Sequence, residues 1–162
     1  MAFTKTSFAP ISNPSITILI LGSMPSDTSL ERGEYYGHPA NRFWKIIAAI
    51  TNNELPLAYP DKKQLLLKAN TGIWDVVHHA NREGSLDSAI KNETPNDLER
   101  FMAKHPQLRV IGFNGKKAEQ LFDKYFTRKP GIKYISLPST SPANASFSFA
   151  RICAAWRGIL GR

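Results

Sequence analysis

The stretch ITILILG, residues 16–22, is a short, β-branched apolar run that stops at a glycine. Such a run is typical of a strand that is buried on both faces of a parallel sheet. Residues 72–78, 108–113 and 133–137 are predicted as three further strands, each with apolar side chains and short length. The sequence therefore predicts four strands.

Helical spacing of apolar residues separates these strands along the chain. The predicted helices are residues 41–50, 61–69, 96–105, 115–126 and 149–160. Strands that alternate with helices imply right-handed crossovers and a parallel sheet covered on both faces. We expect an α/β fold, a three-layer α/β/α arrangement with a central, mainly parallel four-stranded sheet, in which residues 1–162 form a single domain.

Composition limits the functional classes. The chain has 162 residues, 42% of them apolar, and no stretch approaches the roughly 20 apolar residues that a membrane span needs. The first 14 residues lack the apolar core of a signal peptide, so we expect a soluble, cytoplasmic protein without membrane contact. The single cysteine, Cys153, lies in an apolar stretch and is predicted to be a buried structural thiol. No His/Cys cluster has zinc-ligand spacing, and we expect no metal and no cofactor.

The net charge of +8 is unevenly distributed. Residues 1–100 carry 10 Lys/Arg and 11 Asp/Glu, whereas residues 101–162 carry 11 Lys/Arg and only 2 Asp/Glu. A basic region attracts polyanions because each neutralised phosphate releases condensed counterions. Charge alone fits a solvated basic surface equally well, so it suggests nucleic acid without establishing it.

Three loops leave the carboxyl ends of predicted strands, where open α/β sheets bind ligands. They contain GSMPS (residues 22–26) followed by YGHPANRFW (residues 36–44), FNGK (residues 113–116) and STSPAN (residues 139–144). Taken singly, each loop has an ordinary structural explanation. The first is a strand-to-helix loop, the second a turn around an asparagine, and the third a connector stiffened by proline.

Taken together, these segments resemble the uracil-DNA glycosylase superfamily, and specifically its hypoxanthine-DNA (deoxyinosine) glycosylase branch. The first motif is similar to that of this branch, and residues 36–44 resemble the matching segment of the mismatch-specific uracil and thymine glycosylases. FNGK matches their third-strand motif, and STSPAN stands where the superfamily has its DNA-intercalating motif. The resemblance runs from about residue 16 to residue 156. It implies a monofunctional enzyme that flips a damaged base out of DNA, hydrolyses its N-glycosidic bond and leaves an abasic site.

The resemblance assigns the pocket for the flipped base. Tyr36 takes the place of the aromatic residue that stacks on the base, although a tyrosine that only covers the core is the alternative. Asn114 matches the side chain that reads the base through its amide. Backbone N–H groups around Ser23 and Met24 line the other side, and Ser139 is a short donor toward the leaving base.

The resemblance also places the catalytic amide. Mismatch-specific relatives have a water-activating asparagine, and uracil enzymes an aspartate, in the first motif, where this chain has Met24. In the hypoxanthine branch the amide comes from the His-Pro-x-Asn segment, here Asn41. Water that attacks an oxocarbenium-like sugar needs positioning more than deprotonation, so Asn41 is predicted to orient it. The alternative for Asn41 is a helix N-cap.

DNA contacts follow from the same motifs. Pro142, Ala143 and Asn144 are predicted to form the wedge that enters the base stack. The other predicted DNA-binding residues are Ser26, His38, Lys116 and Ser141, with Lys117 and Arg151 as further phosphate contacts. Asp75 is predicted to support the pocket from behind, as a buried carboxylate that needs hydrogen-bond partners.

Three functions remain open at this point. The first is release of hypoxanthine from DNA by a monomeric glycosylase. The second is the same chemistry on uracil, in single strands or mismatches. The third is a nucleic-acid-binding protein that keeps the fold without catalysis, which the presence of Met24 in the first motif suggests.

Overall fold

The central sheet has four parallel strands, as the sequence predicts. The computed structural model describes residues 4–144 and 146–160. The strands are β2 (Ile18–Gly22), β3 (Thr71–Asp75), β6 (Val110–Asn114) and β7 (Lys133–Leu137), in the order β3-β2-β6-β7. The register sets Gly22 beside Asp75 and Asn114 beside Leu137, so the motif residues of three strands end at one edge of the sheet.

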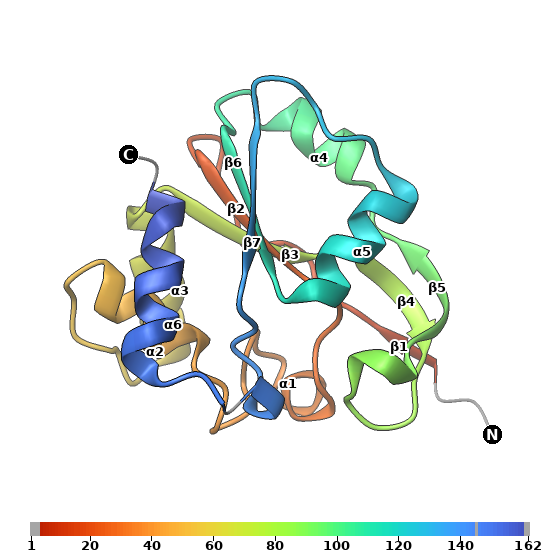
Figure 1. The fold of residues 1–162 in the computed structure, drawn as a ribbon, viewed down its shortest axis with the longest axis horizontal. Helices are drawn as coiled ribbons and strands as arrows, with labels where there is room; N and C mark the ends of the chain where they lie inside the picture. Colours follow the sequence, from red (N-terminus) through yellow and green to blue (C-terminus); the bar gives the residue numbers. More distant parts are fainter. Residues whose placement is uncertain (1–3, 145, 161–162) are drawn as a thin grey trace.

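Strand β2 supplies both hydrophobic cores, because alternate side chains of a strand point to opposite faces. Ile18 and Ile20 pack in one core, whereas Leu19 and Leu21 pack in the other. On the first side lie α2 (Phe43–Ile50), α3 (Tyr59–Lys68) and α6 (Phe149–Trp156), and on the second α4 (Leu98–Lys104) and α5 (Lys116–Tyr125) (Figure 1). The predicted three-layer α/β/α fold is confirmed.

A second sheet was not predicted. It is antiparallel, has the order β1-β4-β5, and consists of β1 (Thr4–Thr6), β4 (Val77–Asn81) and β5 (Lys91–Pro95). The predicted strand at residues 72–78 is wrong in this respect, because β3 ends at Asp75 and the chain enters β4 at Val77. The apolar run continues across the junction, so the sequence does not show where β3 ends and β4 begins. Strands β1 and β5 were missed because they are short, mostly exposed and without an apolar pattern.

Two predicted segments differ in detail from the structure. The loop after β2 contains a short helix, α1 (Asp27–Arg32), which Ser26 caps and Gly33 ends at φ 66°. The predicted C-terminal helix is α6 followed by a 3₁₀ turn, η3 (Arg157–Leu160). Two further 3₁₀ turns, η1 (Asp87–Ala89) and η2 (Pro142–Asn144), lie in loops.

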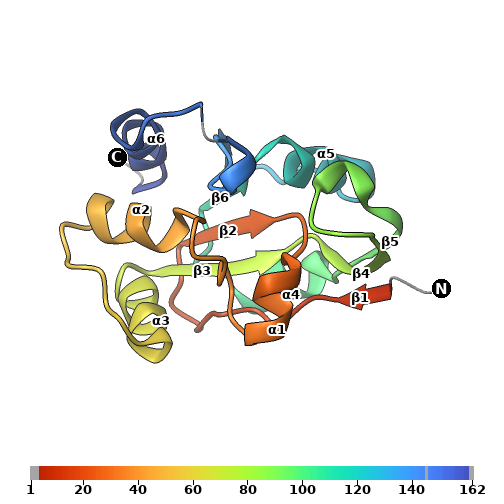
Figure 2. The ribbon, with the colours of Figure 1, turned by 90° about the horizontal axis from the view of Figure 1, so that it is seen from below.

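The loops that leave the carboxyl ends of the strands gather at one end of the molecule, the lower end in Figure 1. Seen from below in Figure 2, α1 lies in front of the sheet and η2 lies between α6 and α5. None of the helices within residues 4–144 and 146–160 is long and apolar enough to cross a bilayer.

Candidate functional site

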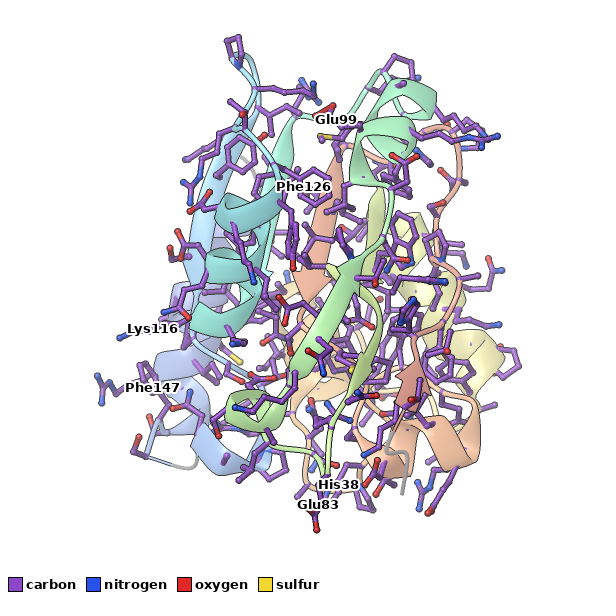
Figure 3. All side chains as sticks on the ribbon, turned by 90° about the vertical axis from the view of Figure 1, so that its right-hand side faces the viewer. His38, Glu83, Glu99, Lys116, Phe126 and Phe147 are labelled. Carbon is purple, nitrogen blue, oxygen red and sulfur yellow. The ribbon has the colours of Figure 1, made fainter. Side chains whose placement is uncertain are left out.

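A cleft of about 1200 Å³ opens at this end of the sheet. It is lined by the segments after β2, β6 and β7, by the last residue of β3, by the segment around η1 and by the loop before α2. The residues predicted for catalysis, base binding and the wedge all line it, as do four of the other predicted DNA contacts, Ser26, His38, Lys116 and Ser141. The full set is Ser23, Met24, Ser26, Tyr36, His38, Asn41, Asn114, Lys116, Ser139, Ser141, Pro142, Ala143 and Asn144. Figure 3 shows His38 and Lys116 toward this end, opposite Glu99 and Phe126.

Tyr36 is held firmly at the cleft. Its ring stacks on Phe43 with centroids 4.1 Å apart, and its backbone adopts φ 54°, a left-handed conformation that is rare for a bulky residue. Helix α1 holds the following residue, because the Gly37 N–H donates to Ser29 Oγ at 2.9 Å and Arg32 Nη1 donates to the Gly37 carbonyl at 2.9 Å. The stack and the two hydrogen bonds therefore fix the aromatic ring before any ligand binds.

Asn41 lies at the start of α2 and at the cleft, so its position is compatible with both roles that the sequence left open. Its Oδ1 accepts a hydrogen bond from the Phe43 N–H at 2.9 Å, which satisfies one free donor at the start of α2. The half-buried side chain also lines the cleft. An amide oxygen has two lone pairs and the nitrogen two protons, so capping leaves polar capacity for a water molecule.

Asn114 is fixed by a residue that the sequence analysis missed. Its Nδ2 donates to Thr140 Oγ1 at 3.0 Å, and its Oδ1 accepts from the Thr140 N–H at 3.0 Å. Thr140 is buried, and its carbonyl accepts from the Arg42 N–H at 3.1 Å. Nothing in the sequence distinguishes this threonine from its neighbours, because its partner is 26 positions away.

Ser139 lies close to the end of β6. A side chain at Gly115, whose φ is +95°, would place its Cβ 3.2 Å from the Ser139 Cβ, so only glycine fits there without strain. Ser139 Oγ accepts from the Ser141 N–H at 3.1 Å, and the Ser139 carbonyl accepts from Asn144 Nδ2 at 2.9 Å. Asn144 thus closes the loop on itself, while Pro142 and Ala143 are exposed at its tip.

Arg42 joins this loop to α2, and its role was also missed. Its Nη1 donates to the Phe147 carbonyl at 2.7 Å and its Nη2 to the Asn144 carbonyl at 3.1 Å. Arg42 directly follows Asn41, so one short segment carries the predicted catalytic amide and anchors the predicted wedge. The planar guanidinium suits such a two-point contact, which an ammonium group cannot reproduce.

Asp75 is the buried carboxyl group of the cleft. It ends β3, is 3% exposed, and its Oδ2 has no hydrogen-bond partner among the described residues; the same holds for the Tyr36 hydroxyl. Burial and, to a smaller extent, the nearby Asp87 carboxylate raise the pKa of Asp75 to about 7 against the lowering effect of Arg82. Burial and the Asp75 charge likewise raise the pKa of the Tyr36 hydroxyl. The hydrogen-bond partner that the sequence analysis expected is therefore absent for Oδ2 among the described residues.

The remaining predicted residues have structural partners in addition to the cleft. Ser23 Oγ donates to Asp87 Oδ1, and Ser26 Oγ caps α1 by accepting from the Ser29 N–H at 3.1 Å. His38 Nδ1 accepts from the Ala40 N–H at 3.0 Å, which places the proton of a neutral ring on Nε2.

Two of the predicted phosphate contacts do not line the cleft. Lys117 is half-buried on α5, and the Arg151 guanidinium lies over the Phe147 ring, 4.8 Å from its centroid. Phe147 itself is a lining residue, so Arg151 lies next to the rim. Within the ranges that the structure describes, no three His, Cys, Asp or Glu side chains are placed to hold a metal ion.

Comparison with known families agrees with this geometry. The family model described as "Uracil DNA glycosylase superfamily" matches residues 9–159, which is most of the chain. The chain belongs to the uracil-DNA glycosylase superfamily. The resemblance that the three loops suggested is therefore confirmed, and the cleft lies where the motifs of this superfamily meet.

Individual superfamily members are similar over nearly the whole chain. A protein of Methanosarcina acetivorans named "Hypoxanthine DNA glycosylase" is 41% identical, over 89% of this chain and 90% of that protein. A protein of the same name from Methanosarcina barkeri is 36% identical, over 86% and 88%. A solution NMR structure of a proposed uracil DNA glycosylase from Methanosarcina acetivorans has a TM-score of 0.82 and 37% identity, covering 97% and 96% of the two chains.

Proposed function

We propose that this superfamily member is a DNA glycosylase that releases hypoxanthine from deoxyinosine and leaves an abasic site. The observation that carries the proposal is that Tyr36 and Asn41, from the segment before α2, line one cleft together with Asn114 at the end of β6. The two relatives named for hypoxanthine support the choice of base over the greater part of the chain. No cofactor is needed, because water is the only co-reactant.

The proposed chemistry begins with a flipped base in the cleft. Tyr36 stacks on the base, which contributes about 1–3 kcal/mol and does not depend on one particular base. Asn114 keeps one free N–H and one free lone pair after its two bonds to Thr140, so it can both donate to and accept from the base. Backbone groups of Ser23 and Met24 and the hydroxyl of Ser139 complete the pocket.

Asn41 has the water-orienting role in this proposal. As the glycosidic bond breaks, the sugar gains oxocarbenium character, and a held water molecule adds to it without prior deprotonation. An amide suits this task because it orients the water by hydrogen bonding. The bond from Phe43 fixes the Asn41 side chain and leaves its second lone pair available.

The DNA strand is proposed to lie across the mouth of the cleft. Pro142 and Ala143, exposed on η2, enter the base stack as the wedge, and Asn144 holds that turn. The predicted contacts at Ser26, His38, Lys116 and Ser141 then meet phosphates along the rim. Since Ala143 is a small wedge, unstable base pairs are the favoured targets, among them hypoxanthine opposite thymine.

The test is alkaline cleavage of labelled duplexes that contain one hypoxanthine or one uracil, opposite thymine and opposite guanine respectively. Wild-type protein is expected to give breaks at hypoxanthine, and Asn41→Ala to lose them. Asn53→Ala, which removes an exposed amide just beyond α2, is the matched control and keeps full activity. Breaks mainly at uracil would move the protein to the second function, and DNA binding without any breaks would indicate the third.

We also propose that residues 1–162 form one glycosylase domain that acts as a monomer in the cytoplasm. Strand β2 contributes side chains to both hydrophobic cores, which supports a single domain. Light scattering coupled to size exclusion, with and without DNA, tests the monomer against its mass of 18.1 kDa. Cell fractionation tests the location.

A further inference from the structure

The floor of the cleft holds two buried polar atoms that nothing in the described chain satisfies. They are Asp75 Oδ2 and the Tyr36 hydroxyl, and both residues line the cleft. Both side chains approach the space above Gly22, since a Cβ on this residue would lie 2.5 Å from Asp75 Oδ1 and 3.1 Å from the Tyr36 hydroxyl. A buried polar atom without a hydrogen-bond partner costs about 1–3 kcal/mol of stability. A ligand that forms hydrogen bonds to these atoms removes that cost, which favours its binding.

Burial, more than the neighbouring charges, favours the neutral form of Asp75. Tyr35 and Tyr36 approach from the loop before α2, Arg82 from the end of β4, and Asp87 from η1. The guanidinium of Arg82 donates its hydrogen bonds to the carbonyls of Gly84 and Pro25 and not to the Asp75 carboxyl group. Burial and the Asp87 charge dominate and raise the pKa of Asp75 to about 7, so about half of the molecules carry a neutral carboxyl at that pH.

We propose that Asp75 is a further catalytic residue, a general acid that donates its proton to a purine seated in the cleft. This inference rests on the proposed glycosylase function and specifies its substrate class. A purine nucleoside has ring nitrogens that carry no proton and can accept one, whereas the only ring nitrogen of uracil outside the glycosidic bond already carries a proton. A carboxyl donor at the floor therefore matches a purine such as hypoxanthine and offers uracil only carbonyl oxygens.

The step balances with water as the only co-reactant. The carboxyl proton moves to a ring nitrogen of the base while the glycosidic bond breaks and its electron pair goes to the base. The purine leaves as a neutral molecule, and Asp75 is left as a carboxylate. The water oriented by Asn41 adds to the sugar, and the proton that it releases restores the neutral carboxyl. General acids of this kind contribute roughly 10²–10⁴-fold to a rate.

The decisive experiment is a pH profile of the single-turnover excision rate on a hypoxanthine duplex, for wild type and Asp75→Asn. The wild-type rate is expected to be level at low pH and to fall about tenfold per pH unit above pH 7. Asp75→Asn keeps the shape and an N–H donor but has no proton to transfer. It is expected to be about 10²-fold slower at pH 6, with no falling limb. A wild-type rate that rises through pH 7, or an Asp75→Asn profile equal to wild type, would overturn the proposal.

A second variant tests the same proton without touching Asp75. Asp87→Asn keeps the acceptor for Ser23 Oγ but removes the repelling charge, so the falling limb is expected to move to lower pH. An unmoved limb means that Asp75 is not the titrating group and overturns the proposal. Asp123→Asn, an exposed carboxylate on α5 paired with Arg128, is the control and leaves the profile unchanged. If wild type excises no hypoxanthine at any pH, the proposed function fails. If wild type excises hypoxanthine and Asp75→Asn does so at the same rate, only the inference about Asp75 fails.

Discussion

Asn114 and Thr140 are joined by two hydrogen bonds of 3.0 Å, one to the backbone N–H of Thr140 and one to its hydroxyl. The pair links the end of β6 to the loop after β7 and leaves the outer half of the amide directed at the cleft. Without this contact the amide could rotate and exchange its donor and acceptor. Thr140 therefore sets the orientation of the amide that we propose to read the base.

Thr140→Val tests this link. The change removes the hydroxyl acceptor and keeps the shape and the backbone bond, so the amide loses one of its two fixed contacts. We expect a loss of about 1 kcal/mol in transition-state stabilisation, or roughly fivefold in the excision rate. Thr94→Val on the exposed face of β5 is the matched control with unchanged rate. Equal rates for wild type and Thr140→Val would show that the backbone bond suffices.

Arg42→Met tests the anchor of the wedge loop. The variant keeps most of the length of the side chain but loses the bonds to the carbonyls of Phe147 and Asn144. We expect faster amide hydrogen exchange in residues 141–144 and 146–147 and an excision rate at least about tenfold lower, because the wedge is no longer pre-positioned. Arg109→Met, an exposed arginine beside β6, should change neither quantity. Unchanged exchange in the loop would contradict the anchoring role.

The sequence predicted the elements that carry an apolar signal. Strand β2 was found because both of its faces are buried, and its alternation between Ile and Leu feeds two cores. Strands β1 and β5 were missed because their exposed, polar residues resemble a loop. Helix α1 was missed for a similar reason, since its six residues contain one buried side chain, Ser29.

The candidate site residues that lie in local sequence motifs could be predicted. Those that act through hydrogen-bond partners far away in the sequence could not. Asn41 and Asn114 lie in recognisable segments. Thr140 and Arg42 act through partners 26 and 102–105 positions away, which no local pattern reveals. The lack of a partner at Asp75 Oδ2 is likewise a property of the folded cleft, because only the three-dimensional surroundings decide it.

Asp75 also predicts how stability depends on pH. Its pKa is raised from 3.8 to about 7, so between these values the folded protein holds a proton that the unfolded chain has released. The free energy of unfolding should therefore fall as pH rises from about 4 to 7, by at most about 1.4 kcal/mol per unit, and level off outside this window. Urea denaturation of wild type and Asp75→Asn at successive pH values measures this. The variant should lose this part of the slope, and parallel curves would show that another group titrates.

Gly115→Ala tests the close approach of two motif loops. Gly115 has φ +95° and faces Ser139, whereas Gly131 has φ +87° and no atom within 4 Å of the position that a Cβ would take. Backbone strain of this kind costs about 1–3 kcal/mol, and only Gly115→Ala adds the clash. We expect Gly115→Ala and the control Gly131→Ala both to lower the unfolding free energy, Gly115→Ala by more, and only Gly115→Ala to lower the excision rate. Similar rates for both would mean that the spacing to Ser139 does not matter for the site.

Lys116→Ala tests whether DNA crosses the rim of the cleft at the start of α5. Lys116 is exposed and lines the cleft, so its ammonium group is placed to neutralise one phosphate. The slope of log affinity against log salt should become shallower by about 1. Lys104→Ala removes an equal charge from the end of α4, the helix whose Glu99 lies at the opposite end of the molecule in Figure 3. If both variants change the slope alike, binding depends on the overall charge of the C-terminal third; if only Lys116→Ala does, the DNA lies at the cleft.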